Sequence, residues 1–216
     1  MENKGKSNSS MWSGNGILIL NPFQSYGKEN IIFSSLDNNG IISGKIKSKK
    51  EKEFHIYSRE RTGNGFFLQM YTLTDGALGK FTFERINNSG LIEGNIKNLS
   101  DTCAARLGNG ALIESTAWNE KLGLKIGKFT NDGLILGRAD DVFFEEAGLA
   151  IGNGVIFIVK YSSLECESIN NKGILSGKVE NFTENHKYSD AKGKNGVGLI
   201  LYGKDIYLGE KTEKEN

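Results

Sequence analysis

Proline, cysteine and histidine are scarce in this chain of 216 residues, and each scarcity excludes a class of structure. A single proline, Pro22, fits dense strand pairing, because proline cannot donate a backbone hydrogen bond to a sheet. Two cysteines, Cys103 and Cys166, cannot form a disulfide framework and lack the spacing of metal ligands. The two histidines, His55 and His186, stand apart from any cysteine or carboxylate cluster, so the sequence predicts no metal site.

Long hydrophobic runs and an excess of charge of one sign are also missing. The longest apolar runs, such as residues 155–159, have the length of a strand and cannot span a bilayer. The net charge of +1 gives no electrostatic reason to expect nucleic acid or an anionic membrane. The N-terminal segment is polar and lacks the apolar stretch of a secretory signal. We therefore expect a cytoplasmic protein that neither binds nucleic acid nor inserts into a membrane.

Glycine is abundant, with 28 residues, and much of it falls in two recurring motifs. The first motif, Gly-Asn-Gly, is centred on Asn15, Asn64, Asn109 and Asn153, with a variant at Asn195. The second motif is a glycine followed by an alternating strand, and it starts at Gly40, Gly90, Gly133 and Gly173. Two motifs that alternate four times establish a tandem repeat of about 45 residues.

The repeat divides the chain into three parts. Residues 1–13 form an N-terminal tail that can supply one closing strand, residues 14–210 form a single repeat domain, and residues 211–216 form a charged C-terminal tail. The repeats within the domain are 14–62, 63–107, 108–151 and 152–192, with a partial repeat at 193–210.

Both motifs fit β-hairpins. Asn-Gly at the centre of a two-residue loop is typical of a type I′ turn, in which both central residues have positive φ. The strand after Gly-Asn-Gly is apolar on both faces, which indicates burial from both sides. In the strand of the second motif, Ile42, Gly44 and Ile46 share one face. The recurring glycine on that face predicts that a large neighbouring side chain packs onto bare backbone.

Adding a more polar outer strand, such as residues 54–59, gives a four-stranded antiparallel unit. Such units, repeated about five times, favour an all-β fold and specifically a five-bladed β-propeller. The partial fifth repeat has only two clear strands, so the segment before Gly14 would have to complete the last blade. The alternative is an open or partly closed β-meander of stacked hairpins, and a sandwich or barrel comes third.

The five Gly-Asn-Gly-type motifs are similar to the repeats of five-bladed lectin propellers of the tachylectin type. The resemblance rests on the repeat length and the three-residue turn. The chain departs from that family in the longer spacing to the next Asn-Gly pair and in lacking the tryptophan that follows the glycines. What the resemblance implies is a lectin-like binding module.

An aromatic residue lies six to eight positions after each Gly-Asn-Gly-type motif, near the end of the first strand of the repeat. These candidate ligand-binding residues are Phe23, Tyr71, Trp118, Tyr161 and Tyr202. Aromatic side chains at one rim can stack on sugar rings or grip an extended partner. The alternative is that they cap the core at the strand ends.

No pattern favours catalysis. The pairs Asp140-Asp141 and Glu145-Glu146 recur in no other repeat, as a calcium or glycosidase site built on the repeat would require. A strand rather than a helix follows Gly-Asn-Gly, so the motif is not a phosphate loop. We therefore expect a non-catalytic module that binds a glycan or a protein, without cofactor or metal. The alternative is a structural or assembly component, such as part of a surface or virion-like particle, and the oligomeric state stays open.

Overall fold

The computed structural model describes residues 14–23, 31–47, 55–56, 63–72, 81–101, 106–117, 123–144, 150–160, 162–184 and 195–209. Within these ranges every regular element is a β-strand, and the all-β prediction is confirmed. No helix there is long and apolar enough to cross a membrane. The expected cytoplasmic location is not tested by this finding and stays a prediction.

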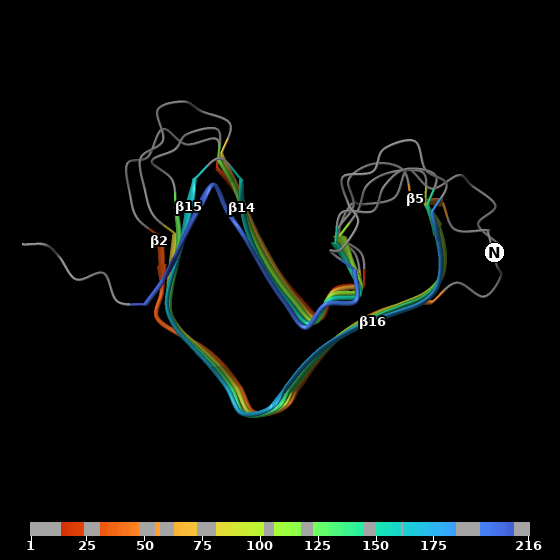
Figure 1. Ribbon diagram of the computed structural model, residues 1–216, viewed down its shortest axis with the longest axis horizontal. Helices are drawn as coiled ribbons and strands as arrows, with labels where there is room; N and C mark the ends of the chain where they lie inside the picture. The colour runs from red at the N-terminus through yellow and green to blue at the C-terminus, as the bar shows by residue number, and fades with distance from the viewer. Residues whose placement is uncertain are drawn as a thin grey trace, which may run out of the picture.

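The chain winds as a parallel β-solenoid, in which each repeat makes one coil and equivalent strands of successive coils pair side by side (Figure 1). Sheet A contains β1 (Ile17–Phe23), β6 (Phe66–Thr72), β10 (Ala111–Ala117), β14 (Val155–Lys160) and β17 (Leu199–Tyr202). Sheet B contains β2 (Ile31–Phe33), β3 (Leu36–Asn38), β7 (Phe81–Asn88), β11 (Leu124–Asn131), β15 (Ser163–Asn171) and β18 (Asp205–Leu208).

Sheet C contains β4 (Ile41–Lys47), β5 (His55–Ile56), β8 (Leu91–Asp101), β12 (Leu134–Phe144) and β16 (Ile174–Glu184). A short sheet D pairs β9 (Arg106–Leu107) with β13 (Ala150–Ile151). Figure 1 shows the labelled strands β14, β15 and β16 as three successive sides of one coil.

The parallel sheets show that the predicted five-bladed propeller and the predicted antiparallel hairpins are wrong. β6 pairs in parallel with β1 and β10, whereas a hairpin would pair it with its neighbour in sequence. Positive φ falls on the glycine that precedes each asparagine, for example 65° at Gly63 and 63° at Gly108. A type I′ turn would instead need positive φ at the asparagine and the glycine after it. The motif therefore turns the chain from one sheet into the next, and the similarity to lectin propellers does not extend to the fold.

We call the Gly-Asn-Gly turn of every coil the first corner, and its asparagines form a buried ladder. Asn64, Asn109 and Asn153 are fully buried. The backbone N and the Nδ2 of Asn109 both donate to Oδ1 of Asn64, at 3.0 and 2.9 Å. Asn153 binds Asn109 in the same way, at 3.0 and 3.2 Å. Stacked identical asparagines thus satisfy one another's polar groups inside the protein.

The ladder also corrects the position of the motif in the fifth coil. The sequence pattern placed the variant motif on Asn195, but Val197 occupies the corner, between Gly196 with φ of 69° and Gly198. The backbone N of Val197 donates to Oδ1 of Asn153 at 2.8 Å. Asn195 instead accepts a hydrogen bond from the backbone N of Ile151. Because this hydrogen bond to Asn153 comes from a backbone N–H, the last coil needs no asparagine at the corner.

The main core lies between sheets A, B and C and includes Phe66, Phe83 and Ile135. The prediction that the strand after Gly-Asn-Gly is buried on both faces is confirmed for the second to fourth coils, where, for example, Phe66 packs in this core and Phe67 in a second cluster, whereas Leu18 of β1 is 38% exposed. The alternation of sheet C is confirmed as well. A Cβ on Gly94 of sheet C would overlap the carbonyl oxygen of Asn109, so the glycine makes room for the next coil's backbone rather than for a large side chain.

Candidate functional site

A second asparagine ladder runs along the turn from sheet B to sheet C, which we call the second corner: residues 38–40, 88–90, 131–133 and 171–173. Asn38, Asn88 and Asn131 each donate from Nδ2 to Oδ1 of the equivalent asparagine in the next coil, at 2.7 Å. The Nδ2 of Asn88 also lies 3.2 Å from the carbonyl oxygen of Gly90. Each ladder residue thus fixes both its own turn and the spacing to the next coil.

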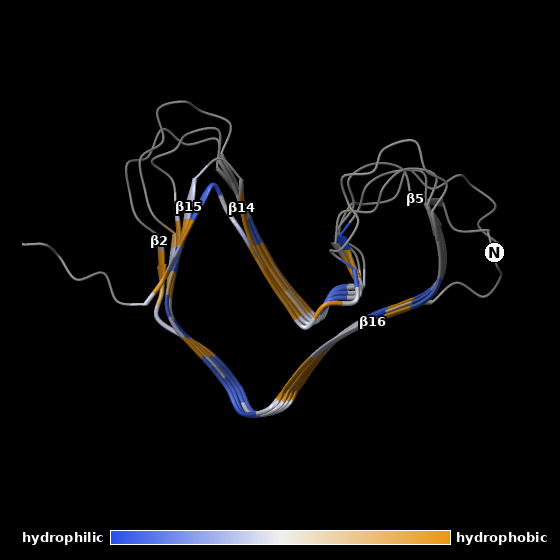
Figure 2. Ribbon diagram, viewed as in Figure 1, coloured by the Kyte–Doolittle hydropathy of each residue, from blue (hydrophilic) through white to orange (hydrophobic). Residues whose placement is uncertain are grey.

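A polar groove of about 230 Å³ lies outside this ladder. Its lining comes from three successive coils and consists of Asp37, Asn38, Asn39, Asn87, Asn88, Ser89, Thr130 and Asp132. Three of these side chains occupy one row on the outer face of sheet B, because Asn87 pairs with both Asp37 and Thr130. Figure 2 shows the hydrophilic stretch that leads along sheet B into this corner.

Asp37 is held as a carboxylate within the groove. The Nδ2 of Asn87 donates to Oδ1 of Asp37 at 2.6 Å, and Nη2 of Arg85 lies 3.4 Å from Oδ2. Hydrogen bonds from Ser35 and Asn87, together with the nearby Arg85, lower the pKa of Asp37 below its ordinary value of 3.8. The groove therefore presents a fixed negative charge near neutral pH.

The groove offers hydrogen bonding of every kind. Carboxylates accept, carboxamides both donate and accept, and the hydroxyls of Ser89 and Thr130 can do either. Across the ranges that the structure describes, no three histidine, cysteine or carboxylate side chains gather as metal ligands. The arrangement is suited to binding a polar molecule that offers several hydrogen-bond donors to the carboxylates.

The structure describes only part of the predicted aromatic rim. Phe23 and Tyr71 lie in β1 and β6, and Tyr202 ends β17 with 44% of its surface exposed. Trp118 and Tyr161 lie outside the described residues. Tyr71 pairs with Thr116, and Tyr202 pairs with Ile158, so these two aromatics occupy different rows of sheet A. Ligand binding by this set stays a prediction.

The interpretation of the sequence missed the groove, although a signal for it was present. Each second corner reads Asn-x-Gly, and the middle residue is Asn39, Ser89, Asp132 or Lys172. The residue before each ladder asparagine is also polar. Only the parallel stacking of coils brings these positions together, so a hairpin interpretation leaves them far apart.

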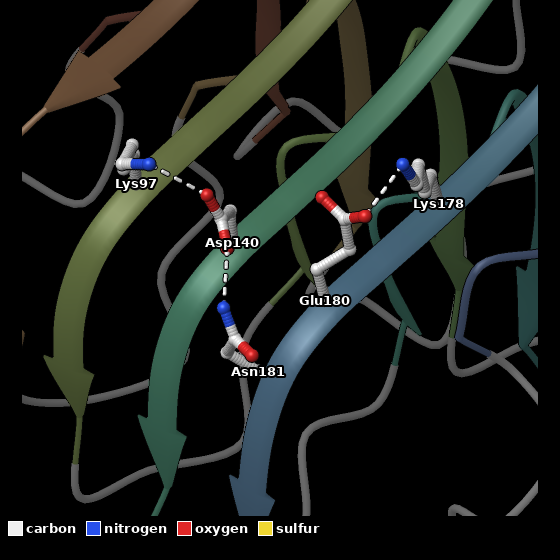
Figure 3. A network of polar contacts seen from close by, with 5 residues as sticks. All are labelled: Lys97, Asp140, Lys178, Glu180 and Asn181. Carbon is white, nitrogen blue, oxygen red and sulfur yellow. Dashed lines mark hydrogen bonds and ion pairs between the residues drawn. The ribbon is translucent and has the colours of Figure 1, made fainter.

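Two other polar groups are structural. On the outer face of sheet C, Nζ of Lys97 lies 2.7 Å from Asp140, and Asn181 donates to the same carboxylate at 3.2 Å (Figure 3). These contacts join neighbouring strands, since Asp140 pairs with Lys97 in the sheet. The ion pair of Arg106 and Glu114, at 2.9 Å, is buried and inaccessible to a ligand.

Comparison with known proteins found no match: no protein-family model, no curated protein and no solved structure matches this chain. The chemistry of the groove is therefore what indicates a function for this protein.

Proposed function

We propose that this chain is a non-catalytic binding module that holds one sugar unit of a glycan in the polar groove of the second corner. The observation that carries the proposal is the lining of the groove, which consists of eight polar residues and includes no apolar residue. Three coils contribute to it, so the binding surface is produced by the repeat itself.

The lining favours a glycan over a protein partner. Sugar hydroxyls both donate and accept hydrogen bonds, which matches a mixture of carboxylates, carboxamides and hydroxyls. The centres of protein–protein interfaces are instead enriched in aromatic and other apolar side chains. At about 230 Å³ the groove is smaller than pockets for drug-sized ligands, which are roughly 300–1,000 Å³, and this favours a single ring.

The second corner is also preorganised for binding. The ladder residues Asn88 and Asn131 are buried beneath the groove and fixed by hydrogen bonds to neighbouring coils. Asp37 is held in place by Asn87 before any ligand arrives. A rigid site loses little conformational entropy on binding, which increases the affinity that a few hydrogen bonds provide.

The test is a glycan-array screen of the labelled full chain, followed by calorimetric titration of the glycans that bind. Asp132→Ala and Thr130→Ala should each weaken binding by about tenfold, since each removes a hydrogen bond of about 1.4 kcal/mol. Asp205→Ala is the matched control, because Asp205 is an exposed aspartate on β18 that does not line the groove. The proposal is wrong if no glycan is retained, or if the groove variants bind as well as the control.

A further inference from the structure

The polar rows of the second corner continue past the groove into the fourth coil. The row of sheet B that contains Thr130 continues with Asn170. The corner position of Asp132 is taken in the fourth coil by Lys172, because the backbone N of each donates to the carbonyl oxygen of the ladder asparagine in the preceding coil, at 2.8 and 2.9 Å. Both Asn170 and Lys172 are exposed. The polar surface is therefore longer than the groove, and it follows the stack of coils.

The free hydrogen-bonding capacity lies at this end of the surface. Four side chains of the third and fourth coils make no hydrogen bond or ion pair with a residue that the structure describes: Thr130, Asp132, Asn170 and Lys172. At the other end of the groove, Asn87 already donates to Asp37 at 2.6 Å. A ligand that leaves the groove toward the fourth coil thus meets polar side chains that have no competing partner.

The two flanks of the corner offer such a ligand less. On the sheet C flank the next outward row is aliphatic, with Leu134 39% exposed and Ile174 54% exposed, and it provides no hydrogen bond. On the sheet B flank the next outward row pairs Arg85 with Lys128, and Arg85 is already bound to Asp37 at 3.4 Å. New hydrogen bonds are therefore most numerous along the stack.

We propose that the second corner binds a linear oligosaccharide that runs along the coil stack, with one sugar unit in the groove and the next over Asn170 and Lys172. The proposal rests on glycan binding in the groove, and it narrows the class of glycan to an unbranched, extended chain. Equivalent residues of successive coils are about 4.8 Å apart, which is comparable with the length of one pyranose unit in an extended chain. Viewed end on in Figure 1, the second corners of successive coils superpose, so this spacing is kept along one straight line.

The fourth coil adds chemistry that the groove lacks. The carboxylate of Asp132 only accepts hydrogen bonds, whereas the ammonium of Lys172 only donates them, and the carboxamide of Asn170 does both. Asp132 and Lys172 occupy adjacent places in the corner row. The bound chain therefore presents hydroxyl donors to the third coil and oxygen acceptors to the fourth, and this gives it one preferred direction along the stack.

The experiment titrates the full chain by calorimetry with linear oligomers, from one to four units long, of the sugar that the glycan array retains. Affinity should rise at least about tenfold from one unit to two and then level off. Lys172→Ala should weaken binding of the two-unit oligomer about tenfold and of the single unit less than about twofold. Lys128→Ala is the matched control, because Lys128 is also an exposed lysine but lies on the sheet B flank, and it should change either affinity less than about twofold.

Chemical-shift mapping gives a second measurement that needs no variant. The two-unit oligomer should shift the amide resonances of Asn170 and Lys172, which the single unit should leave in place. Equal affinities for one and two units, an unchanged affinity of Lys172→Ala for the two-unit oligomer, or a larger loss with Lys128→Ala would overturn the proposal. In those cases, binding of the single unit that Asp132→Ala weakens would show that the groove itself still binds a sugar. An array that retains no glycan would overturn both proposals.

Discussion

The two corners of the coil use the same residue type in opposite settings. At the first corner, in the second to fourth coils, the ladder asparagine and both flanking glycines are buried. At the second corner the ladder residues Asn88 and Asn131 are buried, but the residues beside them, such as Ser89 and Asp132, are exposed. The first corner therefore holds coils together, and the second corner both holds coils together and presents a surface.

The hydrogen bonds differ as well. At the first corner a backbone N–H shares each Oδ1 with a side-chain amide, so Val197 can replace the last asparagine. At the second corner only the side-chain Nδ2 of Asn88 reaches the Oδ1 of Asn131. Both corners therefore need a small glycine, since a Cβ on Gly133 at the second corner would overlap the carbonyl oxygen of Gly90, but only the first corner has a valine in place of one ladder asparagine.

The largest expected effect is steric and arises where sheet C packs against the first corner of the next coil. A Cβ on Gly137 in β12 would overlap the carbonyl oxygen of Asn153, whereas a Cβ on Gly40, which belongs to the first described coil, would meet nothing within 4 Å. Gly137→Ala should therefore cost more than about 4 kcal/mol or prevent folding, and Gly40→Ala should stay within about 1 kcal/mol of wild type. Urea denaturation measures both. Similar midpoints for the two variants would contradict the close packing of coils.

The next effect compares a buried ladder residue with an exposed one. Asn109→Ala removes an acceptor from both nitrogens of Asn153 in a fully buried site, and should destabilise the fold by about 3 kcal/mol. Asn171, at the exposed end of the second ladder, should cost about 1 kcal/mol or less when replaced by alanine. Chemical denaturation measures the stability of both variants. A larger loss of stability for Asn171→Ala than for Asn109→Ala would contradict the ladder.

β15, which leads into the second corner, has a buried inner face that includes Cys166. Burial raises the pKa of the Cys166 thiol to about 11 from 9.0. Below pH 9 the protonated thiol therefore favours the folded state, and this contribution is lost as the pH rises from 9 to 11. In a Cys103→Ser background, labelling by a thiol reagent at pH 8 should be at least about a hundredfold slower than in denaturant. Equal rates would show that this face is open.

The smallest effect lies between the corners, on the exposed face of sheet C. Lys97 and Asp140 form a partly exposed ion pair across neighbouring strands, and Lys97→Ala should cost less than about 1 kcal/mol. Thermal melting at low and high salt measures it, and the difference from wild type should shrink in salt. A loss of more than about 2 kcal/mol in the free energy of unfolding would contradict a minor role for this ion pair.

The repeat and its strand content could be predicted from the sequence, whereas the direction of strand pairing was predicted wrongly. Gly-Asn-Gly between two strands fits a hairpin turn and the first corner equally well, because both need a glycine with positive φ. The informative feature was the strand apolar on both faces, such as β14, which is typical of parallel sheets. A hairpin pairs strands that are adjacent in sequence, whereas this fold pairs Phe66 with Ala111 of the next coil. A local sequence signal cannot indicate a pairing over that separation.

The candidate site could not be predicted for the same reason. Asp37, Asn87 and Thr130 become neighbours only when three coils stack, and no short motif contains them. The aromatic residues were selected because they recur at similar offsets, but the offset of Tyr202 was counted from Gly196, whereas Gly198 is the residue in register with Gly65. Tyr202 therefore lies in a different row from Tyr71. Recurrence in sequence predicts a shared row only where the motif itself is placed correctly in each coil.

In the proposal, the second corner binds a ligand and the first corner does not. Chemical-shift mapping on the isotope-labelled full chain, titrated with a glycan found by the array, distinguishes the two corners. We expect the amide resonances of Asp37, Ser89 and Asp132 to shift with the titration while those of Asn64, Asn109 and Asn153 do not. Shifts confined to sheet A near Tyr202, or spread over both corners, would contradict it.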